Sequence, residues 1–268
     1  MQFKQVADGY TLFYFIMTKF FNNYLFLLCV AFGALFFSSC SKDDDAENDN
    51  GGVVINPDKN IPDPKGTITM NMMVGAKDNS VSIRDLGTIQ INNAYNFKGD
   101  GCSFVSLGKI KGLGNVTAIP QDGWNSSVAV NPGEGYVVGY MDYDLIRYAR
   151  LYVVSEIAGT SGGVIGYTIK CQAPFAPFAP KFTESSLEFG ADETYTSKKL
   201  TLVNLTSVTV KSKPNWCRVY GTVDGFYVSV CSENGMDAER SGIIEFENAE
   251  GSTSVSIKQQ KKSDNPEF

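Results

Sequence analysis

The sequence predicts an all-β protein made of two consecutive β domains, and three observations carry this prediction. From Thr67 onward, apolar and polar residues alternate with a period of two, as they do in half-buried strands. No long stretch carries the apolar stripe of an amphipathic helix. Short apolar segments are instead separated by turns rich in Gly, Pro, Asn and Asp, which is the pattern of consecutive antiparallel strands.

Residues 1–40 are typical of a secretion signal that ends at a cysteine. Lys19 precedes an apolar run at 24–37, and Ser38, Ser39 and Cys40 follow it. At 1.5 Å per residue the run reaches roughly 21 Å, short of the ~30 Å hydrocarbon core that a transmembrane helix crosses. An uncleaved membrane anchor is the alternative, and a true start at Met17 would give a cleaner signal.

The residues around Cys40 resemble a lipobox, with Phe37 where Leu is usual, as in many lipoproteins of Bacteroidetes. The resemblance implies cleavage before Cys40 and acylation of Cys40 with palmitate-type chains. Several chains together anchor a protein effectively permanently, so the expected partner is outer-membrane lipid, at the cell surface or on the periplasmic face. The acidic run that begins at Asp43 resembles the surface-export signal of these lipoproteins, or is simply a solvated linker.

Residues 41–65 are polar, acidic and interrupted by Gly and Pro, so we expect a flexible tether that buries too little apolar surface to fold. The whole chain is mildly acidic, with a formal net charge of −6 and no long basic run apart from Lys261 and Lys262 in the tail at 261–268. Nucleic acids require clustered positive charge, so no nucleic-acid partner is expected.

A first β domain is expected at 66–172. Its clearest strands are 149–157 and 164–171, joined by a hairpin turn at 160–163, with Ala149, Leu151, Val153 and Ile157 on one face. The segments 123–130, 132–140, 148–153 and 162–167 resemble an uncharacterised family of Bacteroidales lipoproteins, which brings no assigned activity. Residues 173–181 carry Pro at every third position and predict a stiff linker, with Phe175 and Phe178 held against a neighbouring domain.

About seven short strands are expected at 182–260, which is the pattern of an immunoglobulin-like sandwich. The segments 214–219, 238–246 and 254–260 resemble the BACON domain, the Bacteroidetes-associated carbohydrate-binding, often N-terminal module. The resemblance implies glycan binding or a spacer role. Trp216 lies in one of these segments and is either a sugar-stacking platform or, as we favour, a core residue.

Four cysteines remain in the mature chain, in an oxidising compartment. A hairpin turning around 223–225 would place Cys217 opposite Cys231 at a distance that suits a disulfide, and two free thiols are the alternative. Pairing of Cys102 with Cys171 stays open.

Histidine is absent from the whole sequence, which excludes Ser-His-Asp and Cys-His catalysis and the usual zinc sites. No cofactor, metal or catalytic residue is therefore expected, and Asp142 and Asp144 lack further ligands for calcium. Carboxylate-based glycoside hydrolysis stays formally open. Its candidates are Glu134, Asp142, Asp144 and Glu156.

Aromatic residues are dense between Gly123 and Val153, and aromatic rings stack on sugars. The candidate ligand surface comprises Trp124, Tyr136, Tyr148 and Tyr152, with Tyr148 and Tyr152 expected to be exposed on the face opposite Leu151; structural tyrosines are the alternative. The sequence thus predicts a non-enzymatic envelope lipoprotein that binds glycans. The alternative is a structural spacer or a protein-interaction subunit of a surface complex.

Overall fold

The computed structural model describes residues 57–75, 81–82 and 88–262. The expected signal, Met17, the lipidation site Cys40 and the first part of the expected tether lie outside these residues. Within the described ranges, no helix has the length and apolar character needed to cross a membrane. The all-β prediction is confirmed: sixteen strands are described, and the one helical element described with them is the 3-10 helix η2 (Leu113–Asn115).

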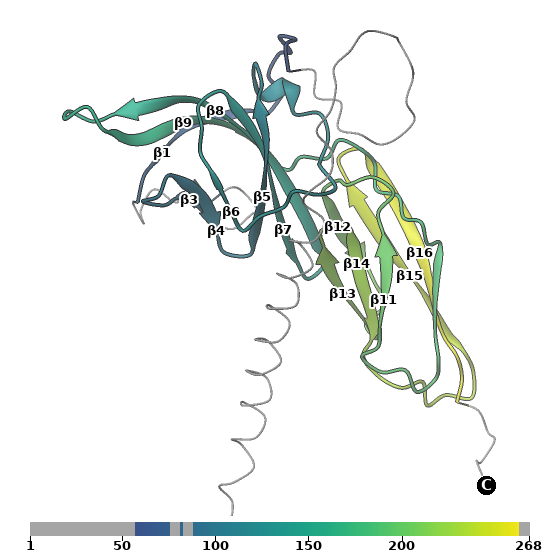
Figure 1. Cartoon of the computed structure of the whole chain (residues 1–268). Helices are drawn as coiled ribbons and strands as arrows, with labels where there is room; N and C mark the ends of the chain where they lie inside the picture. Colours follow the sequence, from purple (N-terminus) through teal and green to yellow (C-terminus); the bar gives the residue numbers. More distant parts are fainter. Residues whose placement is uncertain (1–56, 76–80, 83–87, 263–268) are drawn as a thin grey trace, which may run out of the picture. The chain divides into compact units, whose positions relative to one another are not determined.

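The first region of the fold contributes nine strands (Figure 1). They are β1 (Ile68–Met73), β2 (Val81–Ser82), β3 (Thr88–Ile91), β4 (Asn96–Gly99), β5 (Cys102–Lys109), β6 (Ser127–Ala129), β7 (Glu134–Asp142), β8 (Leu145–Ala158) and β9 (Val164–Gln172). The hairpin predicted at 149–171 is the β8–β9 pair, in which the Gly159 amide donates to the Gly163 carbonyl in the turn. Strands β2, β3, β4 and β6 form a separate small sheet.

Three of the four residues predicted on the inner face of β8 are confirmed there. Ala149, Leu151 and Val153 are buried, in a core cluster that also contains Phe97 and Tyr136. Ile157 is only half-buried, because the register shifts between Val153 and Ser155. This core fills the space between the β5-β7-β8-β9-β1 part of the large sheet and the small sheet. Burial of apolar side chains at roughly 25 cal/mol per Å² is the main stabilising contribution here.

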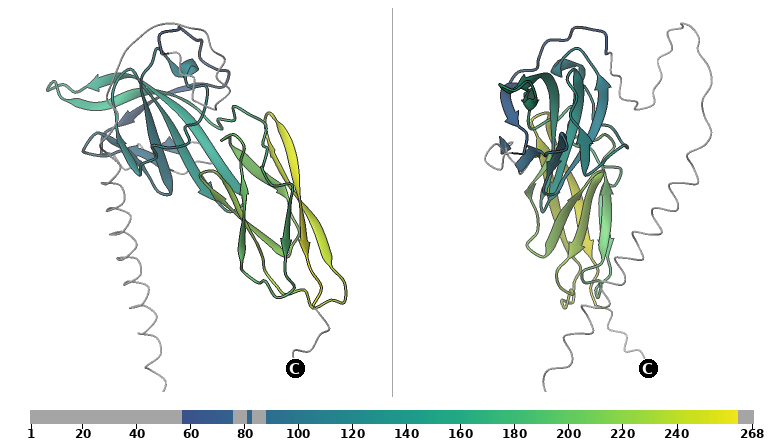
Figure 2. Two further views of the ribbon diagram at one scale, coloured as in Figure 1. Left: turned by 45° about the vertical axis from the view of Figure 1, so that its right-hand side comes forward. Right: turned by 60° about the vertical axis from the view of Figure 1, so that its left-hand side comes forward.

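The second region is the predicted immunoglobulin-like sandwich of seven strands (Figure 2). The strands are β10 (Ser186–Phe189), β11 (Ser197–Thr201), β12 (Val208–Ser212), β13 (Cys217–Thr222), β14 (Gly225–Val230), β15 (Arg240–Asn248) and β16 (Gly251–Gln259). The order β12-β15-β16-β10 forms one layer, with β10 parallel to β16, and β11-β14-β13 forms the other. Between the layers, the ring centroids of Phe182 and Phe246 lie 4.6 Å apart and those of Phe226 and Phe246 lie 5.1 Å apart.

Trp216 packs against the edge of this sandwich core. Its ring is half-buried, and the Arg240 guanidinium lies 4.6 Å from the ring centroid. A cation at this distance interacts favourably with the ring face. Trp216 therefore contributes to the packing of the sandwich.

The two regions are joined through one continuous sheet. Strand β12 pairs with β15 of the sandwich and also with the beginning of β8, where Val208 lies opposite Ile146. One buried cluster runs across the join and includes Ile146 and Tyr148 from the first region with Leu200 and Phe226 from the second. The two predicted domains thus share a core.

The proline-rich segment 173–181 packs on this join. Phe175 is buried, its amide donates to the Tyr148 carbonyl at 2.7 Å, and the Arg150 guanidinium lies 4.6 Å from its ring centroid. Phe178 is 41% exposed, so the prediction for this second ring is wrong. The backbone carbonyl of Phe178 is used instead, since it accepts from the Thr206 hydroxyl at 2.7 Å.

The described part of the expected tether contacts the first region. Asp63 pairs with Lys170 at 2.5 Å, and the Lys65 carbonyl accepts a hydrogen bond from Gln172 at 2.9 Å. Further back, the Asn115 side chain donates to the Lys59 carbonyl at 2.8 Å. Residues 59–65 therefore lie on the surface of the first region.

Candidate functional site: a tyrosine trough on the sandwich

Two of the four aromatic residues predicted to form a ligand surface lie in the core. Tyr136 and Tyr148 are fully buried, so the prediction that Tyr148 is exposed is wrong. Burial raises the pKa of both phenols, and both find backbone acceptors: the Ala129 carbonyl for Tyr136 at 2.9 Å and the Val223 carbonyl for Tyr148 at 2.5 Å. The satisfied hydroxyl groups explain how these tyrosines can be buried.

The other two residues are half-buried. Trp124 donates to the Pro120 carbonyl at 3.1 Å, and its ring lies 5.7 Å from that of Tyr148. Tyr152 packs against the same core cluster as Tyr148. Tyr136 lies in the other core cluster, the hydroxyl of Tyr148 reaches Val223 of the sandwich, and Tyr152 lies opposite Gly135, which Ile110 and Val116 cover. These four residues therefore do not form an open aromatic surface.

An aromatic surface is present on the outer face of the sheet β11-β14-β13. Strand alternation points Cys217, Val219, Phe226 and Val228 into the core, and it leaves the residues between them outside. The outward residues are in register across the sheet: Ser229 lies opposite both Ser197 and Arg218, and Tyr227 lies opposite Tyr220. A row of small polar residues thus runs beside a row of tyrosines.

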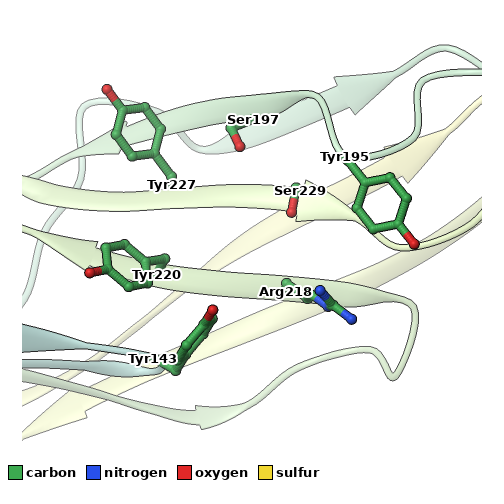
Figure 3. A pocket seen from close by; sticks show the side chains of 7 residues that line it. All are labelled: Tyr143, Tyr195, Ser197, Arg218, Tyr220, Tyr227 and Ser229. Carbon is green, nitrogen blue, oxygen red and sulfur yellow. The ribbon is translucent and has the colours of Figure 1, made fainter. Parts of the chain in front are cut away.

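These residues line a hollow of about 200 Å³, which we call the tyrosine trough. Figure 3 shows the rings of Tyr220 and Tyr227 towards one end and that of Tyr195 towards the other, with Ser197 and Ser229 between them. The lining residues are Tyr143, Tyr195, Ser197, Arg218, Tyr220, Tyr227 and Ser229. The four tyrosine side chains are between 43% and 66% exposed, so they form a group of aromatic rings on the surface of the sheet.

The join between the two regions supplies one ring of the trough. Tyr143 lies in the turn between β7 and β8, and it forms an isolated bridge with Tyr220 of β13. The two ring centroids are 5.2 Å apart at an interplanar angle of 82°. This edge-to-face contact is a preferred aromatic geometry, so it holds both rings in place.

Tyr195 reaches the trough with an unusual backbone conformation. Its φ is 60°, in the left-handed region that non-glycine residues rarely adopt, and its amide donates to the Val230 carbonyl at 3.0 Å. The ring is 64% exposed, so burial of the ring does not compensate for this strain. Such conformations concentrate at functional sites.

The thiols differ from the prediction for Cys217 and Cys231. The hairpin turn contains only the two residues Val223 and Asp224, because Gly225 already pairs with Thr222. A residue with a Cβ at 225 would place that atom 1.9 Å from the Leu200 carbonyl oxygen, so only glycine allows this strand start. The shorter turn shifts the register by one residue.

The register shift places Cys217 opposite Val230 rather than opposite Cys231. None of the four cysteines in the described part of the chain forms a disulfide. Burial is the main cause that raises the pKa of the Cys217 thiol to about 12, so this thiol is protonated and unreactive at neutral pH.

The carboxylates considered for hydrolysis have structural partners. Glu134 accepts hydrogen bonds from Ser106 at 3.1 Å, Asn131 at 3.2 Å and Tyr136 at 2.9 Å. Asp142 accepts from the Tyr143 amide at 2.7 Å, and Asp144 pairs with Lys213. Glu156 is exposed on the β8–β9 hairpin. Across the described ranges, no cluster of three or more Cys, Asp or Glu residues could hold a metal ion.

Comparison with known proteins identifies one family. Residues 69–174 are similar to the family described as a domain of unknown function, DUF5036. This range covers the first region from β1 into the proline-rich segment, so the prediction of an uncharacterised domain family is confirmed there. The match ends before residues 182–260, whose resemblance to the BACON domain stays a prediction. No curated protein and no solved structure matches the chain.

The residues of the trough were not among those predicted from the sequence. Alternation in 217–222 and 225–230 already assigns Arg218, Tyr220, Tyr227 and Ser229 to the outer face, so this signal was available. The contributions of Tyr143 and Tyr195 were not accessible in this way, because both lie in turns whose position depends on the tertiary fold.

Proposed function

We propose that this protein is a non-enzymatic, lipid-anchored envelope protein that binds glycans in the tyrosine trough. The observation that carries the proposal is a set of exposed, ordered tyrosine rings beside a floor of serine hydroxyl groups. Sugars have apolar C–H faces that stack on rings, and their hydroxyl groups pair with side-chain hydroxyls. The trough offers both kinds of contact within one hollow of about 200 Å³.

The size and shape of the trough support a short stretch of sugar units. The rings of Tyr220 and Tyr227 project from neighbouring strands at directly opposed positions, so they form a platform. Ser197 and Ser229 leave space beside that platform because their side chains are small. A ligand that lies along this face would contact β11, β13 and β14 together.

The anchor is part of the proposal. Acylation of Cys40 would attach the protein to the outer membrane, and the chain from residue 41 to 56 would separate the folded part from the lipid surface. Glycans outside the membrane would then be within reach of the trough.

A second candidate function is protein interaction within a surface complex. Tyr and Arg are the residue types most enriched at energetically dominant positions of protein interfaces, and the trough contains both. The serine floor between the rings favours a ligand with hydroxyl groups, so glycan binding is the primary proposal.

The test is a glycan array probed with the full chain in a polyoxyethylene detergent, which has no sugar headgroup to compete. We expect binding to a subset of glycans, and a fall in affinity on the order of tenfold or more for Tyr227→Ala, since stacking of one ring supplies about 1–2 kcal/mol. Growth of the producing cells with a palmitate analogue checks the anchor, because Cys40→Ser should abolish the label.

The matched control is Ile243→Ala, which removes an exposed apolar side chain from β15 in the other layer. This variant should bind as the parent protein does. Binding to no glycan, or equal binding by Tyr227→Ala and the parent, would contradict the proposal and favour the protein-interaction function.

A further inference from the structure

We propose that the tyrosine trough selects acidic sugars, which carry a carboxylate or sulfate group, and that Arg218 is the residue that binds this group. The inference rests on the proposed function, since it names the class of glycan that the same site takes. Arg218 stands in the polar row of the trough, at the position opposite Ser229.

The position of Arg218 suits recognition of an anion. Its guanidinium carbon lies 5.9 Å from the ring centroid of Tyr195, within the range of a weak cation–π contact. A contact with the ring does not use the hydrogen-bonding capacity that the N–H groups offer to a carboxylate or sulfate. A planar guanidinium can donate two parallel hydrogen bonds to a carboxylate or a sulfate.

The charge of Arg218 is not neutralised by the protein. Seven lysines of the described region pair with carboxylates: Lys170, Lys198, Lys199, Lys211, Lys213, Lys258 and Lys262. Arg218 forms no ion pair with any residue that the structure places. Its side chain is exposed, as are other basic side chains outside these ion pairs, so the charge of Arg218 is available to a ligand.

The rest of the trough favours the same ligand. Of the residues with described positions, no Asp or Glu lines the hollow. The acidic groups near the trough residues along the chain have other partners: Asp142 accepts from the Tyr143 amide, and Asp144 pairs with Lys213. Glu193 pairs with Lys198 at 3.1 Å, and Asp224 pairs with Lys199 at 2.6 Å. An anionic group that enters the trough therefore meets one positive charge and hydroxyl donors.

The neighbouring rings strengthen this interaction. Tyr195 and Tyr220 displace water beside the guanidinium when a ligand lies between them, and charge–charge attraction increases where water is excluded. A hydrogen bond between charged partners is roughly twice as strong as one between neutral groups. A sugar that lacks the acidic group would stack on the same rings but would leave Arg218 unpaired.

The test compares matched pairs of sugars on the full chain in a polyoxyethylene detergent. The pairs are oligogalacturonate and its methyl ester, sialyllactose and lactose, and 6-sulfo-N-acetyllactosamine and N-acetyllactosamine. Within at least one pair we expect the acidic member to bind tenfold or more tightly. The first two pairs report a carboxylate, and the third reports a sulfate. Polyglutamate should bind weakly, because it offers charge without a sugar ring.

Two variants assign the preference to Arg218. Arg218→Gln should abolish the difference within the preferred pair, because binding of the acidic member should weaken towards that of the neutral member. Lys258→Gln removes one positive charge from the other layer of the sandwich and should preserve the preference.

Several outcomes would overturn this inference. Equal affinity within every pair, or a preference that survives in Arg218→Gln, would exclude charge selection by Arg218. Polyglutamate binding as tight as that of the acidic sugar would show that the site recognises an anion and not an acidic sugar. Binding of neutral glycans would then leave the proposed function intact. Absence of binding to every glycan of the array would instead overturn the proposed function itself, and this inference with it.

Discussion

Tyrosines occupy outwardly similar strand positions in the two regions, yet their environments are opposite. Tyr136 and Tyr148 on β7 and β8 are fully buried, whereas Tyr220 and Tyr227 on β13 and β14 are 45% and 43% exposed. Each of the four has an apolar residue directly after or before it in its strand, namely Val137, Ala149, Val219 and Val228. Local sequence pattern therefore does not separate the two pairs.

The difference lies in how many faces of each sheet are covered. Strand β8 has one core against Leu151 and a second core against Tyr148, because the sandwich packs on the face that would otherwise be open to solvent. The sheet β11-β14-β13 has a core on one face only. An aromatic side chain on a strand is thus a structural residue or a potential ligand contact according to what covers its face.

The strongest test of this comparison removes a ring from each region. We expect Tyr148→Ala to lower the free energy of unfolding by about 3–5 kcal/mol, because it leaves a cavity in the shared core. Tyr227→Ala should change it by less than about 0.5 kcal/mol, because the ring is exposed. Denaturant unfolding followed by fluorescence measures both. Similar losses for the two variants would contradict the assignment of Tyr227 to the surface.

A second test weakens the join itself. At Gly221 an added Cβ would lie 2.3 Å from the Leu145 carbonyl oxygen, so β13 approaches the beginning of β8 more closely than any other residue allows. Gly221→Ala should lower the free energy of unfolding by roughly 1–3 kcal/mol through the displacement of backbone.

Gly235→Ala is the matched control for the join, since nothing lies within 4 Å of a Cβ at that position. The two variants can be compared by thermal unfolding. If Gly221→Ala unfolds at the same temperature as the parent, the close contact between the regions is not required for stability.

The third test concerns a variant that we expect to raise the free energy of unfolding slightly, where the first two lower it. Tyr195→Asn replaces a bulky residue at a φ of 60° with one that tolerates the left-handed region. We expect the free energy of unfolding to rise by up to about 1 kcal/mol while glycan affinity falls, because the ring is lost from the trough. Unfolding and array binding are measured on the same preparation. A less stable variant would show that the ring of Tyr195 stabilises the fold.

Much of the fold was predictable from the sequence because alternation and turn residues act locally. The β8–β9 hairpin, the inward set Ala149, Leu151 and Val153, and the seven strands of the sandwich follow from these signals. The shared core was not predictable in this way. It depends on the pairing of β12 with β8, which joins residues that are far apart in the sequence.

The predicted aromatic ligand surface in the first region was wrong for a related reason. Expecting Tyr148 and Tyr152 to be exposed assumes that a strand has one buried face. The second face is covered as well, by the sandwich at Tyr148 and by Ile110 and Val116 near Tyr152. The predicted cross-strand partner of Cys217 was wrong by one residue, because a hairpin turn that is one residue shorter shifts every pairing by one position. In both cases the local pattern was correct and the surroundings decided the outcome.

Because the sheet is continuous through β8 and β12, the residues that match the family do not enclose the whole of their own hydrophobic core. The residues that match the DUF5036 family end at 174, one residue before Phe175 enters the core. A polypeptide cut at that boundary would present Ile146 and Tyr148 to water. Wherever this segment is combined with a different neighbour, that neighbour must supply an apolar surface of its own to replace the one contributed here by the sandwich.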